Sequence, residues 1–162
     1  MPIYTTFYAS PLGILAIQGN DQAITSVAFA EEKDYVSAEV PNSLQTCVQQ
    51  LGEYFSGSRQ VFSFPIAQPG TDFQQKVWNV LLSVPFGQTA SYLHIAQLLN
   101  NPGSVRAVGM ANGRNNLAIV VPCHRIIGNN GKLVGYAGGL WRKQWLLEHE
   151  RKQTGQGQLA LF

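Results

Sequence analysis

The chain has 162 residues, of which 45% are hydrophobic and 12% are charged, so the disordered and collagen-like classes are excluded. A chain of this length can bury a core in one or two domains. The net charge of +2 hides an asymmetry, because residues 1–75 carry two basic and seven acidic side chains, whereas residues 76–162 carry nine basic and two acidic ones. The second part is therefore expected to bind a polyanion, with chance segregation of surface charge as the alternative.

The cysteine content and the apolar runs indicate the compartment. Two cysteines cannot form a disulfide framework, and the first residues lack the basic and apolar regions of a signal peptide. No apolar run approaches the roughly 20 residues of a membrane span. The three histidines and two cysteines have no metal-ligand spacing. We expect a cytoplasmic protein without a membrane segment, metal or cofactor.

The first 70 residues are predicted to form a small α/β domain with a connector. Apolar runs over residues 3–8, 14–18 and 23–29 alternate with turn signals and predict an antiparallel meander. Apolar spacing of three and four over residues 43–55 predicts a helix. A further strand is expected over residues 61–64, and residues 65–70 form the connector.

Residues 71–153 are predicted to form a helical domain, followed by a flexible tail over 154–162. Thr71 and Gln74 fit a capping box at the start of a helix. Two short helices, over about 91–99 and 104–111, flank a turn and suggest a helix-turn-helix, although helical hairpins without DNA are common. Residues 117–121 read as a buried extended run.

The sequence Pro122-Cys123-His124-Arg125 is the candidate for chemistry. An imidazole and a guanidinium beside a cysteine would favour its thiolate, which is the nucleophilic form. A structural cysteine is the alternative reading of so short a motif. Cys47, on the apolar helix over 43–55, is expected to be a buried structural thiol.

Beyond this motif, residues 71–150 resemble the 6-O-alkylguanine-DNA alkyltransferases, also called methylated-DNA–protein-cysteine methyltransferases. The resemblance rests on the cysteine motif together with Ser91-Tyr92, Arg106-Ala107-Val108-Gly109, Ala111-Asn112-Gly113-Arg114-Asn115, Gly135-Tyr136-Ala137-Gly138-Gly139 and Trp145-Leu146-Leu147-Glu148-His149-Glu150. The N-terminal part matches in general plan only. The implied fold is a ribonuclease H-like α/β domain followed by a helical domain with a helix-turn-helix.

The resemblance implies a protein that works once. Cys123 would attack the alkyl carbon on the 6-oxygen of guanine and keep the alkyl group as a thioether. His124 would act as the base through a bridging water, and Glu150 would orient it. Tyr92 would donate a proton to the leaving guanine. Repair of 4-O-methylthymine and the preferred size of the alkyl group stay open.

The resemblance also implies contacts with duplex DNA, from which the damaged base is rotated out of the stack. Arg106 would fill the gap, with Ala107, Gly109 and Ala111 giving clearance in the minor groove. Tyr136 and Ala137 would line the base pocket, and the carbonyl of Val121 would accept from the guanine amino group. Asn115 would brace the active-site turn, and Arg125 is counted among the DNA contacts. Two positions depart from the family pattern: Leu93 replaces glycine and Asn116 replaces proline.

The last five residues, Gln158-Leu159-Ala160-Leu161-Phe162, resemble the motif by which bacterial repair proteins bind the sliding clamp. Gln158, Leu159, Leu161 and Phe162 would make the contacts. A tail folded back on the core is the alternative. The protein is otherwise expected to be a monomer.

Three rival functions remain open at this point. A lesion-binding module without chemistry would lack a need for Cys123. A transcription factor would read bases with long polar side chains, which Ala107, Gly109 and Ala111 cannot provide. A cysteine hydrolase using Cys123, His124 and Glu150 would turn over many substrates.

Overall fold

The computed structural model describes residues 1–155 and 160–161. The chain divides into two compact units, which are taken one at a time. Unit 1 consists of Met1–Pro69 with Asn116–Val120, and unit 2 consists of Gly70–Asn115 with the chain from Val121 onward. None of the helices in the described part of the chain has the length and apolar character needed to cross a membrane.

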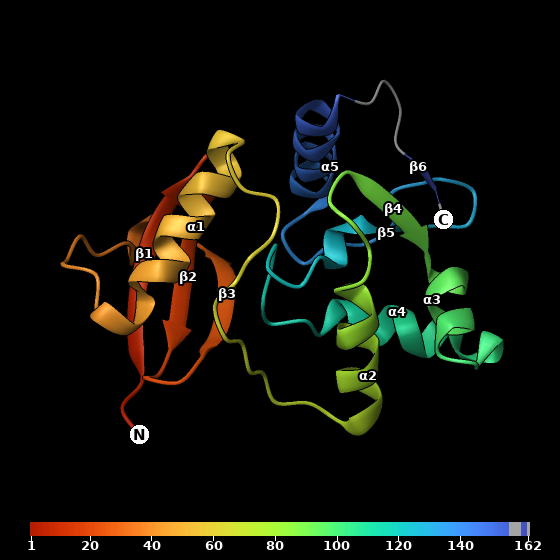
Figure 1. The fold of residues 1–162 in the computed structure, drawn as a ribbon, viewed down its shortest axis with the longest axis horizontal. Helices are drawn as coiled ribbons and strands as arrows, with labels where there is room; N and C mark the ends of the chain where they lie inside the picture. The colour runs from red at the N-terminus through yellow and green to blue at the C-terminus, as the bar shows by residue number, and fades with distance from the viewer. Residues whose placement is uncertain (156–159, 162) are drawn as a thin grey trace. The chain divides into compact units, whose positions relative to one another are not determined.

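Unit 1 is built on a three-stranded antiparallel sheet with the strand order β1-β2-β3. The strands are β1 (Tyr4–Ser10), β2 (Gly13–Gly19) and β3 (Ile24–Ala30). Helix α1 (Gln45–Ser56) lies across one face of this sheet, as Figure 1 shows, and ends at Gly57 in the left-handed conformation. Leu15 and Ile17 alternate along β2 and are both fully buried. The predicted meander and helix are confirmed.

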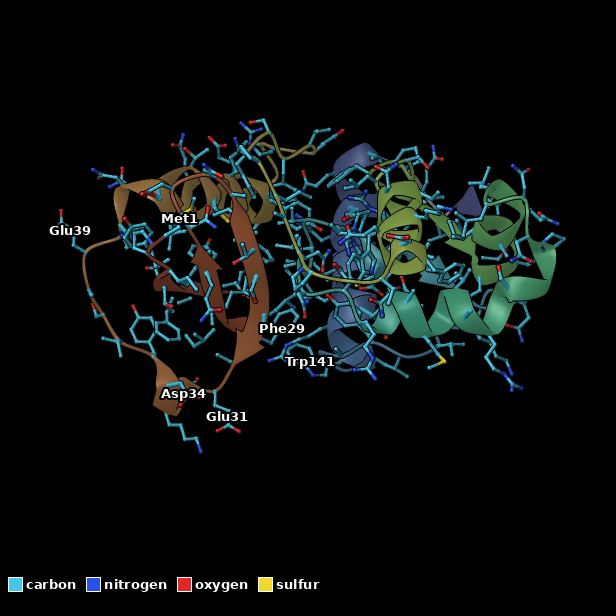
Figure 2. The ribbon with its side chains drawn as sticks, turned by 90° about the horizontal axis from the view of Figure 1, so that it is seen from below. Met1, Phe29, Glu31, Asp34, Glu39 and Trp141 are labelled. Carbon is cyan, nitrogen blue, oxygen red and sulfur yellow. The ribbon has the colours of Figure 1, made fainter. Side chains whose placement is uncertain are left out.

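The strand expected over residues 61–64 is wrong. The amide of Gln50 takes the place of a neighbouring strand, because it accepts from the Ser63 amide at 2.9 Å and donates to the Ser63 hydroxyl at 2.7 Å. Backbone pairing with β3 occurs only farther along, where Ile24 bridges Ile66. The acidic side chains Glu31, Asp34 and Glu39 lie on the exposed segment between β3 and α1 (Figure 2).

The run over residues 117–121 is buried as predicted, but it is not extended. Leu117 bridges Val27 of β3, and the Ala118 amide donates to the Val27 carbonyl at 3.0 Å. The chain then turns at Ile119, whose φ of 72° is rare for a β-branched residue. This turn ends the excursion of residues 116–120 into unit 1.

Unit 2 contains the remaining helices: α2 (Asp72–Leu81), α3 (Tyr92–Leu98), α4 (Val105–Gly113) and α5 (Leu140–Thr154). The capping box is confirmed, since Thr71 accepts from the Gln74 amide at 3.1 Å and Gln74 accepts from the Thr71 amide at 2.9 Å. A short 3-10 turn joins α3 to α4, as expected for a helix-turn-helix. The Trp78 indole fixes α2 to α4 by donating to the Ala111 carbonyl at 2.8 Å.

A small parallel sheet in unit 2 orders the segments around the cysteine motif. Strand β4 (Gln88–Ser91) lies between β5 (Ile126–Ile127) and β6 (Ala160–Leu161). Strand β4 leads directly into Tyr92, and β5 follows directly after the turn that contains Cys123. Pairing of Ala90 with Ile126 therefore ties the two segments together. The fold is the predicted mixed α/β unit followed by a helical unit.

Candidate active site

The cysteine motif forms a tight turn held by Asn115. Residues Cys123–Arg125 make one 3-10 turn after Pro122. The carbonyl of Val121 accepts from the Cys123 amide at 2.7 Å and from the Asn115 side chain at 2.9 Å. These two bonds use both lone pairs of that oxygen. Asn115 thus lies where a bracing residue would be needed. The Val121 carbonyl, which was expected to accept a hydrogen bond from guanine, already accepts these two.

The carboxylate of Glu150, fully buried on α5, connects the turn to the rest of unit 2. One oxygen lies 2.7 Å from His124 Nε2 and 3.0 Å from Arg125 Nη2, and the other lies 2.8 Å from Arg125 Nε. The Gly87 amide also donates to it, at 3.2 Å. Burial alone would raise the pKa of Glu150, but His124 and the permanently charged Arg125 together hold it well below its ordinary value. Glu150 is therefore ionised.

Arg125, which was predicted to be among the DNA contacts, is buried within unit 2. Its side chain is buried, with Nε and Nη2 on Glu150 and Nη1 on the Val84 carbonyl at 2.8 Å. Its guanidinium also lies 5.6 Å from the centre of the Phe86 ring. Buried charge must be paired, and adjacent side chains of a turn diverge, so the arginine serves Glu150 while the cysteine points elsewhere.

The contact with Glu150 determines which nitrogen of His124 can act as a base. An ionised carboxylate only accepts hydrogen bonds, so Nε2 carries the proton and Nδ1 keeps its lone pair. Nδ1 is buried and has no hydrogen-bond partner in the described part of the chain. Burial lowers the pKa of His124, although Glu150 opposes the shift. His124 is therefore held as a neutral imidazole whose Nδ1 lone pair can accept a proton.

The surroundings of Cys123 favour its protonated, thiol form. Burial raises its pKa, and a hydrogen bond from Asn115 and the charge of Lys143 only partly oppose this. The cation near the thiol is thus Lys143 on α5, and not Arg125 as the motif suggested. Lys143 Nζ is bonded to the carbonyls of Val134 at 2.9 Å and Gly135 at 3.2 Å, and burial lowers its pKa to about 8.

Lys143 was not among the predicted site residues, although the sequence contains a signal for it. It lies three, four and seven residues before Leu146, Leu147 and Glu150, and all four side chains are buried. A lysine at helical spacing with a buried carboxylate and two leucines lies on the inner face of its helix. Because lysine is almost never fully buried without partners, this position indicates a built site.

Tyr92 is the first residue of α3 and contacts the same loop as Lys143. Its hydroxyl donates to the Val134 carbonyl at 3.1 Å, so Tyr92 and Lys143 hold the same loop oxygen. Burial and the nearby Cys123 raise the pKa of Tyr92. Tyr136, on the same loop, also has a raised pKa through burial and through Cys123. Both phenols therefore lie within electrostatic reach of the sulfur, whereas Ala137 is exposed.

The outer face of α4 differs in part from the prediction. Arg106 and Ala107 are exposed, but Gly109 faces the Tyr92 ring, which a Cβ there would approach to 3.8 Å. Ala111 is buried. Only Ala107 of the three small residues faces outward, while the other two allow packing inside unit 2. The sequence reading missed the exposed Met110 and Arg114, which lie four and eight residues after Arg106 on the same face.

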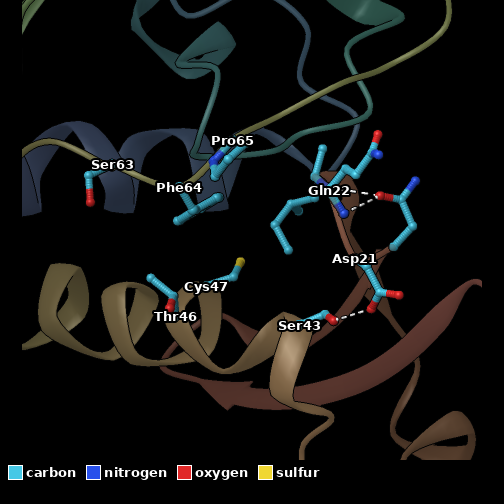
Figure 3. A pocket seen from close by; sticks show the side chains of 11 residues that line it. Asp21, Gln22, Ser43, Thr46, Cys47, Ser63, Phe64 and Pro65 are labelled. Atoms are coloured by element: carbon cyan, nitrogen blue, oxygen red, sulfur yellow. Dashed lines mark hydrogen bonds between the residues drawn. The ribbon is translucent and has the colours of Figure 1, made fainter.

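Cys47 in unit 1 is not a second reactive thiol. It borders a hollow of about 270 Å³ between α1 and residues 63–65, where Asp21 accepts from the Ser43 hydroxyl at 2.7 Å (Figure 3). The cysteine is buried, which raises its pKa to about 12. A thiol with this pKa has almost no thiolate at neutral pH. No group of three His, Cys, Asp or Glu that could hold a metal occurs within residues 1–155 and 160–161.

Removing the charge of Glu150 should destabilise the protein strongly. Glu150→Gln leaves the buried Arg125 guanidinium without its counter-charge, so the free energy of unfolding should fall by about 3–5 kcal/mol. Glu53→Gln breaks the partly exposed ion pair between Glu53 and Arg59 and should lower the free energy of unfolding far less. Urea unfolding followed by circular dichroism measures both, and equal losses for the two variants would contradict the proposed role of Glu150.

Comparisons with known proteins identify the family. Residues 72–152 match the DNA-binding domain of 6-O-methylguanine DNA methyltransferase, and residues 3–68 match its ribonuclease-like domain. The chain is 44% identical over 157 residues to a methylated-DNA–protein-cysteine methyltransferase of Mycolicibacterium paratuberculosis, covering 94% of both chains. It is 46% identical over 159 residues to the constitutive methylated-DNA–protein-cysteine methyltransferase of Bacillus subtilis, covering 91% of this chain and 95% of the relative.

Solved structures agree with this match. The crystal structure of Mycobacterium tuberculosis O6-methylguanine methyltransferase superimposes with a TM-score of 0.84 at 40% identity, covering 94% of each chain. The structure of Mycobacterium tuberculosis OGT in complex with DNA gives 0.84 at 42% identity, over 92% of this chain and 93% of that one. The chain therefore belongs to the methylated-DNA–protein-cysteine methyltransferase family.

Proposed function

We propose that this protein removes the alkyl group from 6-O-alkylguanine in duplex DNA and keeps it on Cys123, one group per molecule. The observation that carries the proposal is the buried array of Cys123, a neutral His124 and an ionised Glu150. The relatives named methylated-DNA–protein-cysteine methyltransferases support it, as does the relative whose structure was solved with DNA.

The geometry supports one order of events. His124 Nδ1 takes the thiol proton, directly or through a water, as Cys123 attacks the alkyl carbon. Glu150 stabilises the imidazolium that forms, because its oxygen lies 2.7 Å from Nε2. The new bond is S–C, and the bond that breaks is C–O6, whose electron pair stays on guanine. Tyr92 gives its hydroxyl proton to the guanine.

The exposed face of α4 is the proposed surface for the duplex. Arg106 lies in the first turn of α4 and Arg114 directly follows its last residue, with the exposed Ala107 and Met110 between them. We infer that Arg106 enters the stack where the base leaves it and that Arg114 contacts phosphate. Tyr136 and Ala137 would line the pocket that receives the base, in a monomeric, cytoplasmic protein.

Intact-protein mass spectrometry tests the function. Equimolar protein and a duplex with one 6-O-methylguanine should give a single added methyl group on Cys123, located by peptide mapping, with no second turnover. Cys123→Ala should stay unmodified, while Cys47→Ala should be methylated as the wild type is. Binding without a mass change would indicate a lesion-binding module, and repeated turnover would indicate a hydrolase. A second duplex with 4-O-methylthymine decides whether thymine lesions are repaired.

The rate of transfer should resist acidification. Burial lowers the pKa of His124 below its ordinary 6.5, so the base stays neutral as the pH falls to that value. Below about pH 7, where Lys143 is charged, the single-turnover rate constant should therefore stay level down to pH 6.5 and fall only below it. A fall with its midpoint above pH 6.5 would contradict a buried neutral base.

We also propose that the C-terminal residues bind the bacterial sliding clamp. Gln158, Leu159 and Phe162 lie outside the described residues, whereas Ala160 and Leu161 form β6, paired with Gln88 and Thr89 of β4. The backbone edge of β6 that pairs with β4 is not available to a clamp groove, so a clamp that used this edge would have to displace β4.

Deleting Gln158–Phe162 should abolish clamp binding, measured by surface plasmon resonance, and leave methyl transfer intact. Gln153→Ala, an exposed change on α5, is the matched control and should keep both activities. Equal clamp binding by the shortened protein would refute the proposal.

A further inference from the structure

Asn112, on the inner face of α4, lies in the site without a role in the steps above. Its side chain is 6% exposed, and its Nδ2 donates to the Cys123 carbonyl at 3.4 Å. That carbonyl can only accept, so the amide is oriented with its donor towards the cysteine turn. The Oδ1 atom is then buried with no hydrogen-bond partner in the described part of the chain.

An unpaired buried acceptor is costly, and proteins retain one where another requirement fixes the group. Here the requirement is that Nδ2, the hydrogen-bond donor of the amide, points into the site. Gly109 lies one helical turn before Asn112, on the face that packs against the Tyr92 ring. Asn112 accordingly lies on the face of α4 that is turned towards Tyr92. Burial and Cys123 raise the pKa of Tyr92, and hydrogen bonding from Asn112 opposes them.

We propose that Asn112 is a positioning residue that supports Tyr92 as the proton donor to the leaving guanine. The inference rests on the proposed function. As C–O6 breaks, guanine takes the Tyr92 proton, and the phenolate oxygen left behind accepts a hydrogen bond from Asn112 Nδ2. The proton that His124 took from Cys123 then restores Tyr92 through solvent, so the net change is one alkyl group moved from oxygen to sulfur.

This role differs from mere support of the Cys123 turn in a measurable way. If Asn112 acts through Tyr92, its removal has no consequence once the Tyr92 hydroxyl is gone. If it only holds the turn, its removal slows the reaction by the same factor whether or not the hydroxyl is present. Asn115, also an amide that holds the turn, is the matched control.

A double-mutant cycle tests the proposal, with single-turnover transfer from a 6-O-methylguanine duplex to the full chain as the readout. Asn112→Leu should slow transfer about tenfold with Tyr92 present, the effect of one lost hydrogen bond. In the Tyr92→Phe background it should change the rate less than about twofold. Asn115→Ala should slow both backgrounds by one factor. Asn112→Asp, which keeps the size but replaces the donor by an acceptor, should follow Asn112→Leu.

Equal slowing by Asn112→Leu in both backgrounds would overturn the proposal. If Asn112→Leu melts at a lower temperature than the wild type, the decision passes to Asn112→Asp, which must show the same dependence on Tyr92. Failure of the proposed function itself would be seen separately, as no methyl transfer to Cys123 in the wild type.

Discussion

A single buried carboxylate organises this site. Glu150 receives two nitrogens of Arg125, one of His124 and the Gly87 amide, and so links α5, the cysteine turn and the loop before β4. Each partner depends on the others, because the arginine offsets the cost of burying the carboxylate, and the carboxylate fixes the tautomer of the imidazole. The base beside Cys123 is thus a product of the fold of unit 2.

Local pattern was enough for the elements whose signals are local. The alternating apolar runs gave the meander, and Thr71 with Gln74 gave the start of α2, because both depend on neighbours in sequence. The expected strand over 61–64 failed for the opposite reason. Its apolar residues resemble a strand, but the Ser63 amide is hydrogen-bonded to the Gln50 side chain instead of a neighbouring strand. No short sequence pattern reveals such a partner.

The site shows the same division. Cys123 and His124 are neighbours in the chain, so their chemistry was visible in the motif, and Glu150 came only from the family resemblance. The direction in which the Arg125 side chain points could not be predicted, because it depends on the Glu150 carboxylate, 25 residues away in the chain. Asn112 was missed because its partner is a backbone carbonyl, which carries no sequence signal, whereas the helical spacing of Lys143 with Glu150 and two buried leucines was a signal left unused. Tertiary structure is what converts these polar residues into parts of a site.

The raised pKa of Cys123 has a consequence for the lifetime of the protein. A molecule that is consumed by its reaction must keep its sulfur intact until it meets a lesion. Peroxides and stray electrophiles react with thiolates and hardly with thiols, so a buried, protonated cysteine ages slowly in the cell. A cysteine that stays in the thiol form until it is used would thus preserve the stock of unused protein.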